Sequence, residues 1–276
     1  MKLAAKPRGG IENLGPAPVV ILVRPQMGEN VGAAARAMLN FGLIDLRLVA
    51  PAFGWPNAKA VAASSGAHEI LNRMTIHARL TDAVDDLHHL FATTARPRGL
   101  NKDIVDARTA AARARLQMAR GRRVGLIFGP ERTGLENDEL TLADALVTVP
   151  LNPAFPSLNL AQAVLLLGYE WHMSTAAEPR PETPAETPAA ESPAGNPHAP
   201  PATKGDLDRL LDHLLTELDD TGFFRSEDRR QSLSHTIRTM FERRRMTRPE
   251  VQLVRGIVKD LVHGRRRRKG EEGQGG

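Results

Sequence analysis

Residues 19–36, VVILVRPQMGENVGAAAR, decide the fold of the first part of this chain. The apolar run at their start predicts a strand, and the alanine-rich end predicts a helix beginning near Asn30, whose side chain is placed to cap it. Gly28 and Gly32 permit close approach of another backbone. Arg36 then lies nearly two turns into the helix, from where its guanidinium can reach toward an anion. Taken alone, an arginine on an alanine-rich helix is more often a surface residue.

The same order of a β-favouring apolar run and a helical pattern recurs along the chain as far as residue 171. This alternation predicts an α/β domain with a mostly parallel sheet, whose ligand binds at the carboxyl ends of the strands. The predicted strands cover residues 19–23, 46–49, 90–93, 124–128 and 146–149, and the predicted helices cover residues 31–41, 58–64, 105–119 and 158–171.

The composition changes between residues 174 and 205, which hold eight of the twenty prolines and almost no large apolar residue. Such a segment cannot bury enough surface to offset its ordering entropy. We therefore predict a proline-rich, disordered linker at 174–205 that separates a domain at 17–173 from a second domain at 206–264. A passive spacer is a better interpretation of this composition than a docking segment.

Beyond the linker, leucines at helical spacing predict a small all-α module. Asp206 is placed to cap its first helix, and residues 247–250, Thr-Arg-Pro-Glu, have the pattern of a capping box for its third. Arginines crowd the polar faces, which favours contact with RNA phosphates, although a solvated helix face is the alternative. The arginines selected as RNA-binding are Arg243, Arg244 and Arg245, and residues 265–276 form a basic, glycine-containing tail.

The amino-acid composition favours some classes of function and excludes others. A net charge of +5 and a pI near 9.9 favour a polyanionic partner, nucleic acid first, while an aromatic content of 4% argues against an extended base-stacking surface. The absence of cysteine excludes disulfides, thiolate nucleophiles and iron–sulfur clusters, and no metal is expected. No apolar run approaches the roughly 18 residues of a membrane span, so we expect a cytoplasmic protein.

Two further polar segments follow predicted strands. One spans residues 128–135, FGPERTGL, and the other runs from residues 149–153, VPLNP, through residues 157–161, SLNLA. The glycines of the first have Walker spacing without the Lys-Ser or Lys-Thr pair, and no G-x-G-x-x-G fingerprint occurs in the sequence, which argues against nucleotide hydrolysis and dinucleotide binding. Taken alone, Ser157 and Asn159 are ordinary capping residues of a helix.

Together, these three segments resemble the motifs of the SPOUT class of RNA ribose methyltransferases. The first motif is matched by residues 30–36, the second by residues 126–135, and the third by residues 147–150 with residues 157–161. The resemblance covers residues 18–171 and is closest to the TrmJ type, whose helical extension is similar to residues 206–262. Three segments of an unrelated sequence would rarely match these three motifs in the same order.

The resemblance implies a fold that periodicity does not show, because the pattern alone favours an unknotted open sheet. It implies a SPOUT α/β knot, with a C-terminal trefoil knot, that holds S-adenosyl-L-methionine between backbone loops, and a homodimer in which two subunits complete each site. By position, the cofactor-binding residues are Thr93, Thr94, Ala95, Gly129, Pro130, Val149, Pro150, Leu151, Ser157, Leu158 and Asn159.

The resemblance also implies roles for side chains in methylating a ribose 2'-hydroxyl. Arg36 occupies the position assigned as base, supported by Asn30, although a guanidinium is almost always protonated and orientation with stabilisation of the alkoxide is the safer role. Glu131 is placed to orient Arg36 from the same or the neighbouring subunit. Ser157 and Asn159 are placed to hold the ribose and phosphate. The loop arginines Arg96 and Arg98 are placed to contact the RNA backbone, although Arg98 with Gly99 could equally form a solvated turn.

The predicted function is therefore S-adenosylmethionine-dependent 2'-O-methylation of tRNA, with nucleotide 32 of the anticodon loop as the position that the TrmJ type implies. Three alternatives stay open: methylation of rRNA or another tRNA position, a catalytically silent RNA-binding protein on the same fold, and an unrelated α/β enzyme acting on small nucleotides. The intact motifs argue against the silent binder, and the arginine-rich module argues against the small-nucleotide enzyme.

Overall fold

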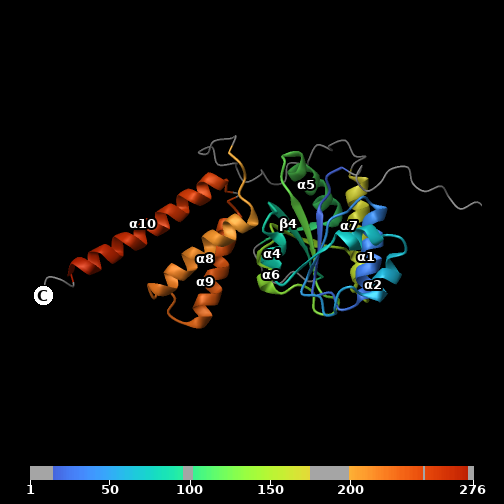
Figure 1. The fold of residues 1–276 in the computed structure, drawn as a ribbon, viewed down its shortest axis with the longest axis horizontal. Coiled ribbons are helices and arrows are strands. Elements are labelled where there is room, and N and C mark those ends of the chain that lie inside the picture. The colour runs from blue at the N-terminus through green and yellow to red at the C-terminus, as the bar shows by residue number, and fades with distance from the viewer. Residues whose placement is uncertain (1–14, 96–101, 175–198, 245, 273–276) are drawn as a thin grey trace, which may run out of the picture. The chain divides into compact units, whose positions relative to one another are not determined.

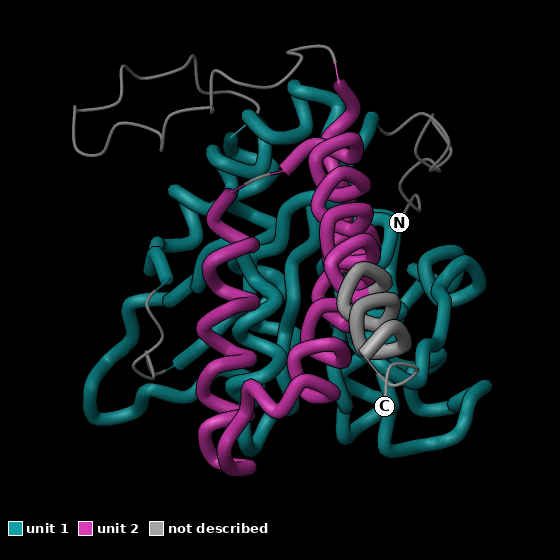
Figure 2. The backbone as a smooth tube through the Cα atoms, turned by 90° about the vertical axis from the view of Figure 1, so that its left-hand side faces the viewer, with its two compact units in different colours: residues 1–180 teal, residues 181–276 magenta. Residues whose placement is uncertain are grey.

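The computed structural model describes residues 15–95, 102–174, 199–244 and 246–272 of the chain, with side chains as far as residue 262. The chain divides into two compact units, residues 1–180 and residues 181–276, which Figure 2 colours separately. Each unit has its own hydrophobic core.

Within the described residues of the first unit, seven strands form one sheet in the order β3-β2-β1-β6-β4-β7-β5, and every neighbouring pair is parallel. The α/β architecture predicted from the sequence is thereby confirmed, while the trefoil knot stays a prediction. The strands are β1 (Val19–Val23), β2 (Leu46–Val49), β3 (Thr75–His77), β4 (His89–Thr93), β5 (Asp103–Asp106), β6 (Val124–Phe128) and β7 (Ala145–Thr148).

The two strands at the edges of the sheet were missed by the sequence analysis. β3 has three residues, none of them buried, and β5 buries only Val105. Neither has the apolar run on which the strand predictions rest. The prediction of a helix from residue 105 was wrong at its start, because Val105 lies in β5 and Asp106 caps the helix by accepting a hydrogen bond from the Thr109 amide at 2.7 Å.

Helices cover both faces of the sheet. Figure 1 shows α1, α2 and α7 on one side and α4 and α6 on the other. Alternate residues of β1 supply the two cores, with Val20 and Leu22 in one and Val19, Ile21 and Val23 in the other. The helices are α1 (Gly28–Asn40), α2 (Ala58–Ser64), α3 (His68–Arg73), α4 (Leu80–Val84), α5 (Ala107–Ala119), α6 (Asn137–Thr141) and α7 (Leu160–Met173).

The glycines at the start of α1 allow close packing, as predicted, and their neighbour is α2. A Cβ on Gly32 would lie 2.1 Å from the Ala60 carbonyl oxygen, and one on Gly28 would lie 2.2 Å from the Asn57 side-chain oxygen. Asn57 caps α2 with that oxygen, accepting hydrogen bonds from the Lys59 and Ala60 amides. Both glycines therefore fix the position of α1 against α2.

The described part of the second unit consists of α8 (Lys204–Asp220), α9 (Glu227–Glu242) and α10 (Arg248–Glu272). Leu207, Leu210 and Leu211 of α8 pack with Val251 of α10 in its core. The predicted capping box of α10 is confirmed: the Thr247 amide donates to Glu250 at 2.6 Å and the Glu250 amide donates to the Thr247 hydroxyl at 3.4 Å.

The structure moves two predicted boundaries of the helical module. The predicted linker ends too late, because the Ala202 amide donates to the Met246 carbonyl at 3.0 Å, the Arg248 amide donates to the Pro200 carbonyl at 2.9 Å, and α8 already begins at Lys204. Asp206 therefore lies inside the first turn, where it completes a capping box with Thr203. The predicted tail at 265–276 is helical as far as Glu272, where α10 ends. Residues 175–198 of the linker lie outside the described residues.

Candidate active site

The carboxyl ends of four adjacent strands, in the order β1-β6-β4-β7, carry the segments that the sequence analysis singled out. Residues 24–27 connect β1 to α1, Gly129 and Pro130 follow β6, Thr94 and Ala95 follow β4, and residues 149–159 connect β7 to α7. Because all four strands are parallel, these connections emerge at the same edge of the sheet. The topology thus brings three motifs from distant parts of the sequence together.

Side-chain hydrogen bonds join the three motifs through Asn30. Its amide nitrogen Nδ2 donates to Oε1 of Glu131 at 2.5 Å, and its oxygen Oδ1 accepts from Nδ2 of Asn159 at 2.9 Å. The other oxygen of Glu131 accepts from the Gln26 amide at 3.2 Å. Asn30 is 8% exposed, so breaking these bonds would leave polar atoms in a water-poor place.

Asn30 and Asn159 have different structural roles. The prediction that Asn30 caps α1 was wrong: α1 begins two residues earlier, its N-cap position is Met27, and the Asn30 side chain points into the network instead. Asn159 is the N-cap of α7 and forms a capping box with Gln162, accepting from the Ala161 amide at 2.8 Å. Its amide group remains available for Asn30, so one residue both starts α7 and binds the first motif.

The second motif is a tight loop that requires its two glycines. A Cβ on Gly129 would lie 2.4 Å from the Leu135 amide nitrogen, and Gly134 adopts φ +68°, where side chains are strained. The Gly134 amide closes the turn by donating to the Pro130 carbonyl at 3.0 Å. This loop holds Glu131, half-buried, against the start of α1.

Arg24 holds the start of the β1–α1 connection against α6, and the sequence analysis did not select it. It directly follows β1 with φ 45°, and its guanidinium forms a two-pronged ion pair with Glu139 of α6 and a further pair with Glu136 at 3.1 Å. The hydrogen bond with Glu139 raises the pKa of Arg24 above its ordinary value, so it stays charged. Its position directly after the first predicted strand was the available signal, but a partner 115 residues away in sequence could not be recognised from local patterns.

Arg36 does not join this network. It lies six residues after Asn30, which places it about 120° away around the helix axis and about 9 Å along it. Its side chain is exposed, and among the described residues it has no hydrogen-bond or ion-pair partner. Glu131 pairs with Asn30 and the Gln26 amide, so within one subunit the expected contact between Glu131 and Arg36 is absent from the described residues.

The selected residues of the three cofactor loops lie at the same sheet edge, with different exposure. Thr93 is the last residue of β4 and its hydroxyl donates to the Ile127 carbonyl at 3.1 Å, while the Thr94 amide donates to the Val147 carbonyl at 2.9 Å. Pro150 and Ser157 are exposed, and Val149, Leu151 and Leu158 are half-buried. Arg96, Arg98 and Arg245 lie outside the described residues, whereas Arg243 and Arg244 are exposed at the end of α9.

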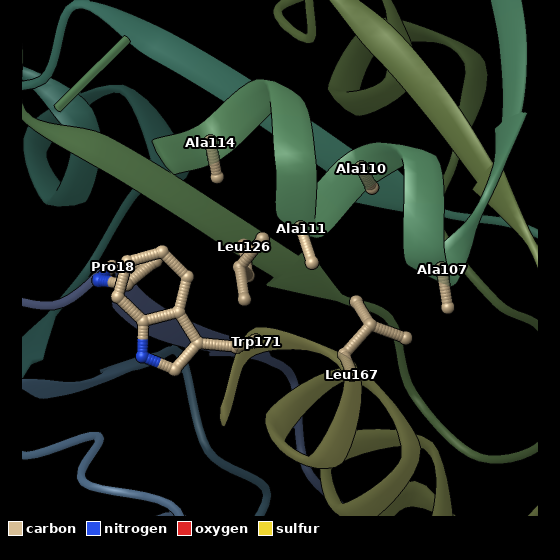
Figure 3. A pocket seen from close by; sticks show the side chains of 8 residues that line it. All are labelled: Pro18, Ala107, Ala110, Ala111, Ala114, Leu126, Leu167 and Trp171. Carbon is tan, nitrogen blue, oxygen red and sulfur yellow. The ribbon is translucent and has the colours of Figure 1, made fainter. Parts of the chain in front are cut away.

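A small pocket elsewhere in the first unit does not fit a polar ligand. Figure 3 shows it between α5, α7 and β6, lined only by proline, alanine, leucine and tryptophan side chains. Its position on the face of the sheet separates it from the loops at the carboxyl edge. The lining residues are Pro18, Ala107, Ala110, Ala111, Ala114, Leu126, Leu167 and Trp171.

Two kinds of feature are absent from the described residues of the chain. These residues contain no helix that combines the length and the apolar character needed to cross a membrane. They also contain no group of three or more histidine, aspartate or glutamate side chains placed to hold a metal ion.

Comparison with known families assigns both units. Residues 17–169 match the model of the SpoU rRNA Methylase family, and residues 205–272 match the model described as tRNA methyltransferase TrmJ, C-terminal domain. The chain belongs to the SpoU methylase family. The sequence resemblance to SPOUT methyltransferases of the TrmJ type is thereby confirmed.

Relatives in this family match nearly the whole chain. The chain is 33% identical over 242 residues to the tRNA (cytidine/uridine-2'-O-)-methyltransferase TrmJ of Yersinia pestis strain Pestoides F, covering 88% of this chain and 90% of the relative. It is 34% identical to the protein of the same name from Photorhabdus laumondii, covering 88% and 95%. The crystal structure of TrmJ from Z. mobilis ZM4 matches with a TM-score of 0.76 at 41% identity, covering 89% and 99%.

We predict that Asn30→Ala lowers the free energy of unfolding by about 1–3 kcal/mol, because it removes two side-chain hydrogen bonds, one of them to the Glu131 carboxylate. Chemical denaturation of the full chain measures the change. Asn40→Ala, at an exposed position on the same helix, is the matched control and should stay within about 0.5 kcal/mol of the parent. Equal stability of the two variants would show that the network does not hold the motifs together.

Proposed function

We propose that this protein transfers a methyl group from S-adenosyl-L-methionine to the 2'-hydroxyl of a ribose in tRNA, at nucleotide 32 of the anticodon loop. The observation that carries the proposal is the Asn30 network, which joins the three motifs of a SpoU methylase at one sheet edge. The helical unit, which matches the TrmJ C-terminal model, favours tRNA over rRNA as substrate. The names of the Yersinia and Photorhabdus relatives support cytidine and uridine as targets. Localisation in the cytoplasm stays a prediction.

The loops at the ends of β4, β6 and β7 fit the proposed cofactor. Thr93, Thr94 and Ala95, Gly129 and Pro130, and residues 149–151 carry no charged side chain, so backbone groups would bind the cofactor. Ser157, Leu158 and Asn159 would close the same site, since Asn159 is bonded to the first motif. When bound, the cofactor supplies an electrophilic methyl group on a sulfonium.

The residues of the chain then have to align and activate the ribose hydroxyl. Holding oxygen and methyl group in line removes much of the entropic barrier. Arg36 is exposed and has no hydrogen-bond or ion-pair partner among the described residues, so its guanidinium is available to bind the ribose 2'-oxygen as it becomes an alkoxide. Because a guanidinium keeps its proton near neutral pH, we assign Arg36 orientation and charge stabilisation, and Ser157 contact with the ribose or its phosphate. The carbon–sulfur bond breaks as the oxygen–carbon bond forms, and the hydroxyl proton would pass to a phosphate oxygen of the substrate and from there to solvent.

We expect Arg36→Ala to lower kcat for tRNA methylation about 100-fold or more while leaving cofactor affinity and fold unchanged, because it removes stabilisation of the developing charge. Arg36→Lys should fail as well, since a point charge on a flexible stem does not replace a planar donor fork. Transfer of labelled methyl groups into tRNA measures the rate, and Arg73→Ala, an exposed arginine on α3, is the control. Normal turnover by Arg36→Ala would remove Arg36 from the mechanism.

We also propose that two copies of the chain assemble through α7. Leu165, Tyr169 and Met173 recur at four-residue spacing on this helix and are 41%, 45% and 46% exposed. A second subunit also accounts for Arg36, which lies off the network of its own subunit and is free to complete the site of a partner. The proposed homodimer therefore places each active site between subunits.

Leu165→Glu should convert a dimer into a monomer with greatly reduced methyl transfer, because a carboxylate in an apolar contact is unpaired. Light scattering over a range of protein concentrations measures the assembly. Leu116→Glu changes an equally exposed leucine of α5 and should leave the dimer intact. A fully active Leu165→Glu monomer would contradict the shared site.

We propose that the helical unit binds the tRNA backbone. Arg243 and Arg244 are exposed at the end of α9, next to residue 245, and are the RNA contacts that we select. The loop arginines Arg96 and Arg98 remain proposed contacts of the first unit.

Replacing both Arg243 and Arg244 with serine should weaken tRNA binding and reduce the slope of log affinity against log salt by about 1–2, because each phosphate contact contributes about 0.7–0.9 to that slope. Filter binding at several salt concentrations measures it. Serine at Arg73 and Arg113, two arginines of the first unit, is the control. An unchanged slope would move the proposed RNA contacts away from α9.

Nucleoside mass spectrometry of tRNA and rRNA from a deletion strain would locate the methylated nucleotide.

A further inference from the structure

Phe155 is an aromatic side chain that the proposed mechanism does not use. It is 74% exposed, the largest exposed fraction among the large apolar side chains of the described residues. It lies in the connection between β7 and α7, two residues before Ser157 and four before Asn159. An aromatic ring this exposed contributes little to the core of its own subunit and is available to contact a binding partner.

The backbone around Phe155 is held in a defined turn. The Asn152 side-chain oxygen accepts from the Ala154 amide at 3.0 Å, and the Asn152 carbonyl accepts from the Phe155 amide at 2.9 Å. Pro153 and Pro156 on either side restrict the backbone further. A ring presented on such a turn loses little conformational entropy when it binds.

The network ties the end of the connection that carries this turn to the proposed site. Asn159, where the connection ends, donates to Asn30 at 2.9 Å. Met27, three residues before Asn30, is 51% exposed and lies on the connection that leads into α1. Two apolar side chains thus stand on two connections that the Asn30–Asn159 hydrogen bond ties together, where the substrate ribose is proposed to bind.

We propose that the ring of Phe155 stacks on the base of the nucleotide that is methylated. Proteins that recognise single-stranded RNA commonly stack unpaired bases on aromatic side chains. A phenylalanine ring has no hydrogen-bonding group, so it accepts cytosine and uracil alike, as stacking tolerates any base with a π face. The low aromatic content argues against an extended stacking surface, but one ring at the site is sufficient to hold one base. This inference rests on the proposed function.

The experiment compares Phe155→Ala, Phe155→Leu and Phe155→Tyr in the full chain, with steady-state methylation of tRNA as the readout. We expect Phe155→Ala to lower kcat/KM for tRNA about 10-fold to 100-fold, mainly through KM, because stacking on one base is lost. Phe155→Tyr should restore activity and Phe155→Leu should not, since leucine replaces the apolar area but not the flat ring. Cofactor affinity and light scattering should be the same for all four proteins.

The outcomes separate this inference from the function on which it rests. If the parent protein does not methylate tRNA, the proposed function fails before any variant is made. If the parent is active, full rescue by leucine, loss of the dimer in Phe155→Ala, or unchanged kcat/KM in Phe155→Ala would each overturn the stacking role. Rescue by tyrosine alone, with the dimer and cofactor affinity intact, would support it.

Discussion

The hydrogen bonds of one buried amide, that of Asn30, determine whether the candidate site exists as a unit. Asn30 lies 101 residues before Glu131 and 129 residues before Asn159, and among the described residues its side chain joins the first motif to both of the others. An asparagine suits this position because its side chain donates and accepts at once, whereas a carboxylate only accepts. Glu131 on one side and Asn159 on the other use these two capacities.

The surroundings of Asn30 explain why its position is well defined. Gly32 brings α1 against α2 at a distance that excludes any side chain, and Arg24 anchors the end of β1 to α6 through Glu139. The second motif is likewise fixed by glycines that allow a close turn. The α1–α2 packing on one face of the sheet and the Arg24–Glu139 ion pair on the other both restrain the β1–α1 segment. The hydrogen bonds of Asn30 then connect this restrained segment to the second and third motifs.

Much of this arrangement could be predicted from the sequence, for identifiable reasons. The central strands have apolar runs long enough to be recognised, and the motifs directly follow them, so both the sheet and the edge at which the motifs meet were predicted. The edge strands β3 and β5 are short and exposed, and leave no such pattern. Asn30 has the residue type and position of a cap, and only tertiary contacts direct its side chain elsewhere. The partners of Arg24 and Asn30 lie far away in sequence, which local patterns cannot reveal.

Asn159 is at the same time the first cap of α7 and the last member of the polar network. The connection that carries the third motif and the helix with the exposed apolar face therefore cannot move independently. A ligand that binds one conformation of the connection more tightly than another therefore changes the free energy with which a partner binds α7. The coupling is reciprocal, so a partner on α7 changes the affinity of the connection for its ligand by the same factor. For a protein that assembles through α7, occupancy of the loops would consequently depend on protein concentration, and dilution alone would weaken the hold on small ligands.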